Sequence, residues 1–182
     1  IDQEERILRP ANFPEGAPGR GAAVFKTKAG IKVGVVNLQG RVFMEALECP
    51  FKTGRRLVEE LSKETKVVIV DIHAEATSEK VALGWYLDGK VSAVLGTHTH
   101  IPTADEKILP QGSAYITDVG MVGSQDSVIG RKIEDVLARF VTSLPMRFEV
   151  AKDNIQLQGV VLDIDEETGK ARSIIRIQRK QL

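Results

Sequence analysis

The stretch KVVIVDIH, residues 66–73, decides the fold. It is rich in β-branched residues and apolar without interruption up to Asp71, which is typical of a strand buried on both faces of a parallel sheet. Similar stretches lie on either side of it in the chain, at residues 22–28, 31–38, 91–98 and 113–119. We therefore expect a central sheet built from these five strands.

Helical spacing of apolar residues separates several of these strands. It predicts three helices, at residues 52–64, 77–87 and 131–144. In the second helix Val81 and Trp85 lie one turn apart, and Pro145 ends the third. Three further strands are expected near the end of the chain, at residues 146–151, 155–165 and 171–179. The sequence thus predicts an α/β sandwich in which alternating strands and helices are followed by an antiparallel meander.

The composition limits the class of protein. Lys and Arg (25) balance Asp and Glu (25), which supports neither a surface for duplex nucleic acid nor a polybasic membrane anchor. The longest apolar runs are far shorter than the roughly 20 residues of a transmembrane helix, and no signal peptide is recognisable. The single cysteine, Cys49, excludes an intramolecular disulfide and has no base beside it in sequence. These features predict a soluble protein of the cytoplasm.

All three histidines of the chain come where a predicted strand meets a loop. His73 ends the stretch quoted above, and His98 and His100 lie in the sequence GTHTH. In an extended segment residues i and i+2 share one face, so these two imidazoles can point into one space, within about 7 Å of each other. Neutral imidazole is the commonest metal ligand, and this edge of an α/β sheet is where ligands bind. The pattern predicts a shared metal site as readily as three hydrogen-bonded surface histidines.

Acidic residues accompany His73 in the sequence. Asp71 has the same strand parity and is expected to face the same space, either as a ligand or as the acceptor that fixes a histidine tautomer. Glu75 lies two residues after His73 and is a second candidate for this supporting position. Glu79 is interpreted as an ordinary charge in the first turn of a helix.

Two segments could bind an anionic substrate. Arg41 in NLQGR can bind a phosphate through two N–H groups of its guanidinium, or it can be a solvated surface residue. Gly120 and Gly123 in TDVGMVGS follow a strand, where backbone N–H groups can approach an anion, although a plain glycine turn explains them equally well. The sequence contains no nucleophile elbow, Walker loop, dinucleotide-binding glycine motif or H-E-x-x-H helix.

Several segments together resemble one family of proteins. GTHTH resembles the G-H-x-H signature of calcineurin-like metallophosphoesterases. The chain resembles the YmdB branch of that superfamily in five longer segments, which are RPANFPEGAPGRG, NLQGR, DIHAEATSEK, ALGWYLDGKVSAVLGTHTHIPTAD and ILPQGSAYITDVGMVG. That branch contains bacterial phosphodiesterases acting on cyclic nucleotides, including 2',3'-cyclic AMP. The resemblance runs along nearly all 182 residues.

The resemblance implies a fold, a cofactor and a reaction. The fold is a four-layer α/β/β/α sandwich with two transition-metal ions, commonly iron or manganese, at the strand ends. His73 and His98 would bind one ion and His100 the other. The implied reaction is hydrolysis of a small phosphodiester, with 2',3'-cyclic nucleotides as expected substrates, by water activated between the two ions.

The sequence departs from the family pattern at its start. The family's G-D-x-x-G, G-E-N and G-N-H motifs, which carry an aspartate ligand, a bridging glutamate, an asparagine ligand and the general acid, do not occur. Residues 1–182 are therefore interpreted as the C-terminal two thirds of one metallophosphoesterase domain without its N-terminal strands and helices. We expect no general acid in this chain and no activity of the chain alone. We also expect it to bind the N-terminal segment of the same protein, or to form homo-oligomers through exposed sheet edges.

Two other interpretations stay open. The chain can be a non-catalytic regulatory or interaction module that has kept the fold and part of the site. It also resembles, less closely, capsule-biosynthesis proteins of the same superfamily, which act at the cell envelope.

Overall fold

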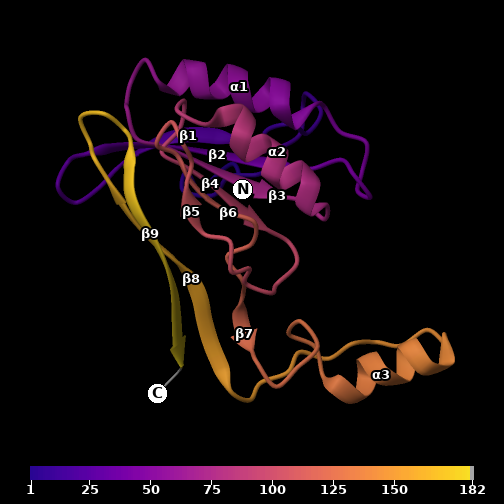
Figure 1. The fold of residues 1–182 in the computed structure, drawn as a ribbon. Coiled ribbons are helices and arrows are strands. Elements are labelled where there is room, and N and C mark those ends of the chain that lie inside the picture. The colour runs from indigo at the N-terminus through magenta and orange to yellow at the C-terminus, as the bar shows by residue number, and fades with distance from the viewer. Residues whose placement is uncertain (181–182) are drawn as a thin grey trace.

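The computed structural model describes residues 1–180, which form an α/β fold with two sheets (Figure 1). The larger sheet has six strands in the order β1-β2-β3-β4-β6-β5. The central strands β2, β3, β4 and β6 are parallel, and β1 and β5 run antiparallel at the edges. Their bounds are Ala22–Lys26 (β1), Lys32–Gln39 (β2), Val68–His73 (β3), Ala93–Thr97 (β4), Lys107–Ile108 (β5) and Ala114–Ile116 (β6). The five expected strands are confirmed, and β5 is an addition.

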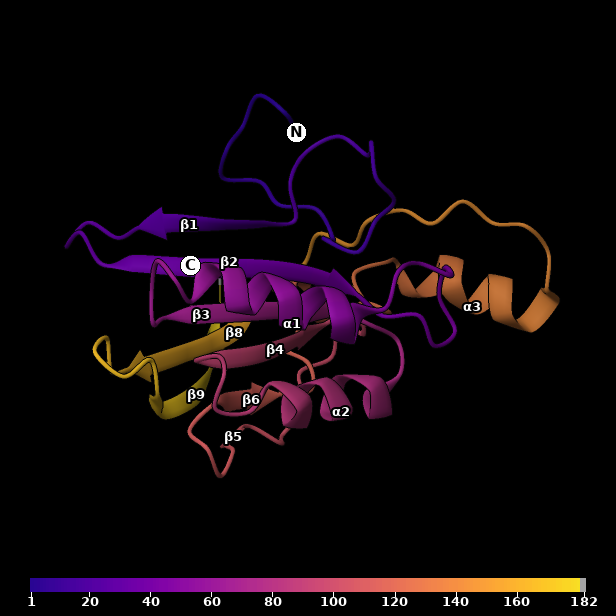
Figure 2. The ribbon, with the colours of Figure 1, turned by 90° about the horizontal axis from the view of Figure 1, so that it is seen from above.

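One face of this sheet holds the main hydrophobic core. Val68, Val70 and Ile72 of β3 are buried on that face, whereas Asp71 and His73 share the opposite face. The helices α1 (Pro50–Leu61) and α2 (Thr77–Leu87) lie side by side over the core (Figure 2). The predicted helices in these two regions are confirmed. The histidine that ends β3 therefore points away from the helices, toward the second sheet.

The helix α2 has the expected bounds but buries a different face. Val81 is only partly buried and Trp85 is 52% exposed, so the spacing of these two residues does not mark the core stripe. The buried face instead begins with Glu79 and Lys80, which are 7% and 0% exposed. Apolar spacing cannot find this face, because two charged side chains are buried there among polar partners.

The smaller sheet is antiparallel, in the order β7-β8-β9, and covers the other face of the large sheet. Its strands are Val122–Ser124 (β7), Ile155–Ile164 (β8) and Ala171–Lys180 (β9). The side chains of Ala93, Ala114 and Ala171 meet between the sheets, with Leu162 and Ile174 packed around them. These small residues let the two sheets approach closely.

The prediction of a strand at residues 146–151 is wrong. Within residues 1–180 this segment makes only an isolated bridge, between Val150 and Arg131. Met146, Phe148 and Val150 are exposed. Their alternation is that of a strand, but a strand also needs a neighbour to pair with. The meander begins instead with β7, which the sequence did not predict.

The helix α3 (Ile133–Thr142) confirms the helix expected at 131–144 and projects from the body of the molecule (Figures 1 and 2). It buries only Val136, and it ends at Ser143, whose backbone is left-handed. In the part of the chain that the structure describes, the layers are helices, large sheet and small sheet. The α/β class is confirmed, and the outer helical layer of the expected sandwich is not formed by these residues. None of the described helices has the length and apolar character needed to span a membrane.

Candidate metal centre

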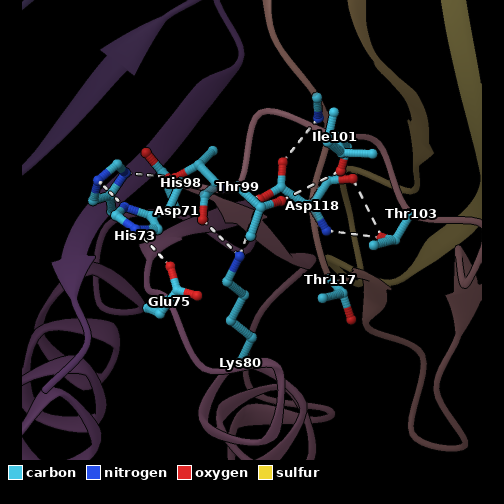
Figure 3. A network of polar contacts seen from close by, with 12 residues as sticks. Asp71, His73, Glu75, Lys80, His98, Thr99, Ile101, Thr103, Thr117 and Asp118 are labelled. Atoms are coloured by element: carbon cyan, nitrogen blue, oxygen red, sulfur yellow. Dashed lines mark hydrogen bonds and ion pairs between the residues drawn. The ribbon is translucent and has the colours of Figure 1, made fainter. Parts of the chain in front are cut away.

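His73 and His98 meet at the carboxyl ends of β3 and β4 (Figure 3). The two strands are parallel neighbours, and His73 is paired with Thr97, the last residue of β4. Nε2 of His73 lies 2.9 Å from Nδ1 of His98, and the two rings are nearly perpendicular, at 85°. The parallel sheet thus brings together two imidazoles from separate strand ends.

The GTHTH segment does not continue as a strand. β4 ends at Thr97, and His98 and His100 have φ angles of 107° and 68°, in the left-handed region that residues with a Cβ rarely adopt. The expectation that both histidines share one face of an extended strand is therefore wrong. His98 turns toward His73, whereas Nδ1 of His100 lies 3.0 Å from the carbonyl oxygen of Ile129.

Hydrogen bonds determine which nitrogen of His73 is free. Its Nδ1 lies 3.3 Å from Oγ1 of Thr97, and the Thr97 hydroxyl donates to Oδ1 of Asp71 at 2.9 Å. Because that hydroxyl gives its only proton to Asp71, Nδ1 of His73 must be the donor and Nε2 carries the lone pair. The side chain of Asn37 donates to the other oxygen of Asp71 at 2.7 Å. Asp71 therefore orients His73 through Thr97.

The other two histidines follow the same pattern. Nε2 of His98 lies 2.9 Å from a carboxylate oxygen of Glu75, so this nitrogen carries a proton and Nδ1 is left free toward His73. Nδ1 of His100 donates to the carbonyl of Ile129, which leaves Nε2 free. Metal-binding histidines usually have this arrangement, in which one ring nitrogen donates a hydrogen bond and the other is available to the metal.

The His73–His98 pair fits one transition-metal ion. At 2.9 Å these two nitrogens can share a proton, or, when both rings are neutral in the tautomers described above, they can offer their two lone pairs to one cation. Two nitrogens that each lie about 2.1 Å from one ion, at right angles, are about 3.0 Å apart. Within residues 1–180, no group of three or more His, Cys, Asp or Glu side chains is arranged to hold a metal ion. Two imidazoles alone are therefore not a complete metal site.

The surroundings favour the form of His73 that binds a metal. Burial is the main cause that lowers the pKa of His73 below its ordinary value of 6.5, and His98 lowers it further when its own ring is charged. Burial also raises the pKa of the Asp71 carboxyl, against the opposite effect of hydrogen bonds from Thr97 and Asn37. Because the neutral imidazole is the ligand, His73 stays available at lower pH than an exposed histidine would.

Arg41 lies at the same edge of the sheet. The neighbouring Gly40 donates its N–H to the carbonyl of His73 at 2.9 Å. The N–H of Arg41 donates to both carboxylate oxygens of Glu79, at 3.0 and 3.1 Å, and the Arg41 side chain is exposed. Glu79 does lie in the first turn of α2, as the sequence predicted, but it is also buried and fixes the backbone of this loop.

Gly120 lies in the loop between β6 and β7, and Gly123 lies in a strand. Gly120 has a φ of 88°, but its N–H already donates to Oδ1 of Asp118 at 3.0 Å. Gly123 lies inside β7, opposite Gln156 of β8. The N–H of Gly120, which the sequence offered to an external anion, is therefore bonded to the carboxylate of Asp118.

Sequence reasoning missed several residues behind the histidines. Asn37 of β2 is paired with Asp71 and Thr97 of β4 with His73, and the register of these strands would have revealed both residues. Lys80 forms an ion pair with Asp118 in which both side chains are 0% exposed. No periodicity in the sequence signals a buried lysine, because lysine is normally solvated.

Comparison with known proteins identifies the family. Residues 1–177 match the family model of YmdB-like proteins. The chain belongs to the YmdB-like family. A 2',3'-cyclic-nucleotide 2'-phosphodiesterase from Bacillus subtilis (strain 168) is 53% identical over 177 residues, which cover 97% of this chain and 67% of that relative. The YmdB resemblance found in the motifs is confirmed. The chain spans 62 to 67% of the length of three curated relatives.

Two solved structures share the fold of this YmdB-like chain. A hypothetical protein from Thermus thermophilus has a TM-score of 0.92 and 42% identity, and the match covers 100% of this chain and 70% of that one. A novel phosphatase from Mycoplasma pneumoniae has a TM-score of 0.89 and 37% identity, with 98% and 65% covered. The arrangement of the two sheets is therefore that of solved proteins with clearly related sequences.

Proposed function

We propose that this YmdB-like chain forms part of a metal-dependent phosphodiesterase that hydrolyses small phosphodiesters, with 2',3'-cyclic AMP as the preferred candidate. The observation that carries the proposal is the contact between His73 and His98, whose free nitrogens face each other at 2.9 Å. The name of the B. subtilis relative supports the reaction and the substrate class. The likeness to the M. pneumoniae phosphatase supports chemistry on a phosphoester.

Three histidines would hold the metal ions in this proposal. His73 and His98 would bind one ion and His100 a second, with iron and manganese as the proposed metals. When bound, such ions polarise a phosphoryl oxygen and activate water for attack on phosphorus. Asp71, acting through the Thr97 hydroxyl, holds His73 in the tautomer that such an ion needs, and Glu75 does the same for His98. The chain's own residues thereby keep the ligands oriented.

Arg41 is the residue that we propose for binding the substrate phosphate. Its side chain is exposed at the histidine edge of the sheet, and its backbone is fixed by Glu79. A guanidinium can donate two parallel hydrogen bonds to a phosphoryl group, and its charge complements that of a phosphodiester.

We also propose that these 182 residues are inactive by themselves. Two cations about 4 Å apart repel each other, and a bridging carboxylate normally offsets that repulsion. The described residues offer imidazoles at the strand ends but no complete ligand group. The bridging ligand and the general acid would come from the part of the relatives that this chain does not span. The proposed setting is the cytoplasm, either with that segment bound or as a homo-oligomer.

A chimera tests this proposal. The 177 residues of this chain that align with the B. subtilis relative replace their counterparts there, and the relative supplies the remainder of the site. We expect the chimera to contain a transition metal by elemental analysis and to convert 2',3'-cyclic AMP to a nucleoside monophosphate. His98→Ala in the chimera should remove most of both, because it deletes one of two facing ligands. Arg172→Gln, an exposed change on β9, is the matched control and should retain both.

Two results would contradict the proposal. Undiminished turnover by the His98→Ala chimera would show that the histidine pair is not needed for the reaction. A folded chimera with less than one metal ion per chain, and no hydrolysis of 2',3'-cyclic AMP or bis-p-nitrophenyl phosphate, would instead favour a regulatory or interaction module.

A further inference from the structure

A buried ion pair lies directly beneath the GTHTH segment (Figure 3). Nζ of Lys80 in α2 is 3.0 Å from Oδ2 of Asp118, and both side chains are 0% exposed. Removing two charges from water is unfavourable unless further hydrogen bonds satisfy both groups. The groups that form these further hydrogen bonds therefore indicate which part of the structure the ion pair supports.

The further bonds of the Lys80–Asp118 pair go to the two sides of His98. Nζ of Lys80 donates to the carbonyl oxygen of Thr97 at 2.7 Å, which is the peptide group before His98. Oδ2 of Asp118 accepts the N–H of Thr99 at 2.9 Å, which is the peptide group after His98. The other oxygen of Asp118 accepts the N–H of Gly120 and so fixes the carboxylate itself. Both peptide groups that set the backbone of His98 are bonded to one buried ion pair.

The backbone of His98 needs such support. Its φ of 107° is sparsely populated for any residue with a Cβ, and a conformation of this kind persists only where the surroundings impose it. With a relaxed backbone the chain would leave β4 in another direction, and the imidazole would lose its place beside Nε2 of His73. Two fixed bonds on either side are what the strained conformation requires.

We infer that Lys80 and Asp118 are positioning residues, which hold the strained backbone of His98 so that its imidazole stays paired with His73 for metal binding. This inference rests on the proposed metal-dependent function. It assigns to the α2 lysine and the 118 carboxylate a purpose beyond stability, since the pair touches neither imidazole. Partners behind a metal ligand typically change metal affinity by about 10- to 100-fold when they are removed.

The test separates stability from positioning with a double variant. Lys80→Met alone leaves a buried carboxylate without a partner and destabilises the fold, so it cannot distinguish the two effects. Lys80→Met/Asp118→Leu replaces both charges by apolar groups and should recover much of the lost melting temperature. These variants and the unmodified chain are compared within the chimera described above, which supplies the remainder of the site. The affinity of the double variant for Co²⁺, titrated by visible absorbance, should nevertheless be at least about tenfold weaker than that of the unmodified protein, because both bonds beside His98 are gone. If this variant fails to fold, Lys80→Met/Asp118→Asn, which is closer in shape, takes its place.

The matched control is Leu87→Ala on the same helix. Leu87 is 0% exposed, and its truncation opens a cavity beneath α2 and lowers the melting temperature without touching the bonds to Thr97 or Thr99. We expect Co²⁺ affinity to stay within about twofold of the unmodified chain in this control, since the outer support of His98 is intact.

A crystal structure of the metal-free double variant provides a second readout. The inference predicts that the left-handed backbone at His98 relaxes and that its contact with His73 is lost. It is overturned if His98 keeps both features, or if the double variant binds Co²⁺ as tightly as the unmodified chain. Absence of Co²⁺ binding by the unmodified chimera, which contains the remainder of the site, would count against the proposed function, whereas the metal-free structure still decides whether the pair positions His98.

Discussion

His100 and Ile129, which touch through a hydrogen bond, are both in the left-handed backbone region. Their φ angles are 68° and 46°, and Nδ1 of His100 donates to the Ile129 carbonyl at 3.0 Å. Left-handed backbone at a β-branched residue is a true outlier, and each such residue costs about 1–3 kcal/mol. Together with His98, three residues with left-handed backbone therefore lie in the GTHTH segment or in contact with it. Such strain is commonly concentrated at functional sites.

Thr97 links the Asp71 carboxylate to the His73 ring, and its removal should be measurable. Thr97→Val deletes the hydroxyl that donates to Asp71 and accepts from His73. We expect the free energy of unfolding in urea to fall by about 1–3 kcal/mol, since both partners are left partly unsatisfied. Thr97→Ser keeps the hydroxyl and should lie within about 1 kcal/mol of the unmodified chain. Equal free energies of unfolding for the Val and Ser variants would show that the Thr97 hydroxyl does not contribute to stability.

Because of Tyr115, the free energy of unfolding should change with pH in the alkaline range. Tyr115 is 1% exposed, its hydroxyl lies 2.9 Å from Oγ1 of Thr117, and burial raises its pKa to about 12. The unfolded chain loses this proton near pH 10, whereas the folded chain keeps it until about pH 12. The stability contributed by neutral Tyr115 is thus complete below about pH 10 and is lost as the pH rises toward 12.

Urea unfolding at several alkaline pH values checks this expectation. Tyr115→Phe is the matched variant, because it keeps the ring and removes the ionisable hydroxyl. The free energy of unfolding of Tyr115→Phe should depend less on pH in this range than that of the unmodified chain. Parallel pH profiles for the two proteins would contradict a raised pKa at Tyr115.

Among the elements, β4 and the segment after β6 approach each other at Gly96. A Cβ at Gly96 would overlap the carbonyl oxygen of Thr117 and lie 3.0 Å from Cδ of Lys80. Because the nearest atom belongs to the backbone, Gly96→Ala must move one element away from the other. We expect a loss of about 3 kcal/mol or more in the free energy of unfolding.

The control for Gly96→Ala is another glycine in a strand. A Cβ added to Gly123 of β7 would meet only the flexible Met121 side chain, at 3.5 Å or more. Gly123→Ala should therefore change the free energy of unfolding by less than about 1 kcal/mol. If both substitutions cost the same, the close approach at Gly96 is not what makes alanine unfavourable there.

The elements that could be predicted from the sequence are those that local patterns define. β-branched runs predicted the strands ending at His73 and Thr97, and apolar spacing predicted three helices. The pattern failed at residues 146–151, where alternation occurs without a neighbouring strand, and at α2, where Lys80 and Glu79 are buried. Both failures depend on contacts between distant segments, which no local pattern contains.

At the scale of the whole molecule, the candidate site was predicted in part. Three histidines at strand ends indicated a metal site, because parallel strands end at a common edge. Two contacts at that edge could not be predicted from the sequence and became visible only in the folded structure. The turn of His98 toward His73 depends on a left-handed backbone, and the hydrogen bond from Gly120 to Asp118 depends on a side chain that folds back onto its own loop.

Stability should be distributed unevenly over the molecule. α2 and α3 have similar lengths, 11 and 10 residues, but α2 packs on the core and α3 buries only Val136. We expect backbone amides of α3 to exchange with deuterated water at least about tenfold faster than those of α2, because local opening of α3 exposes little apolar surface. Mass spectrometry of peptic fragments measures the exchange rates of both helices. Equal protection would show that α3 is held by contacts beyond those of the single described chain.

The exposed position of Trp85 gives the molecule an optical reporter of its own. The chain contains one tryptophan, and it is 52% exposed on α2, the helix that carries Lys80 on its buried side. Its fluorescence therefore comes from a single place, and a displacement of that helix would change the solvent around the indole and shift the emission. Folding and metal-binding experiments on this protein can follow α2 in real time without an added label.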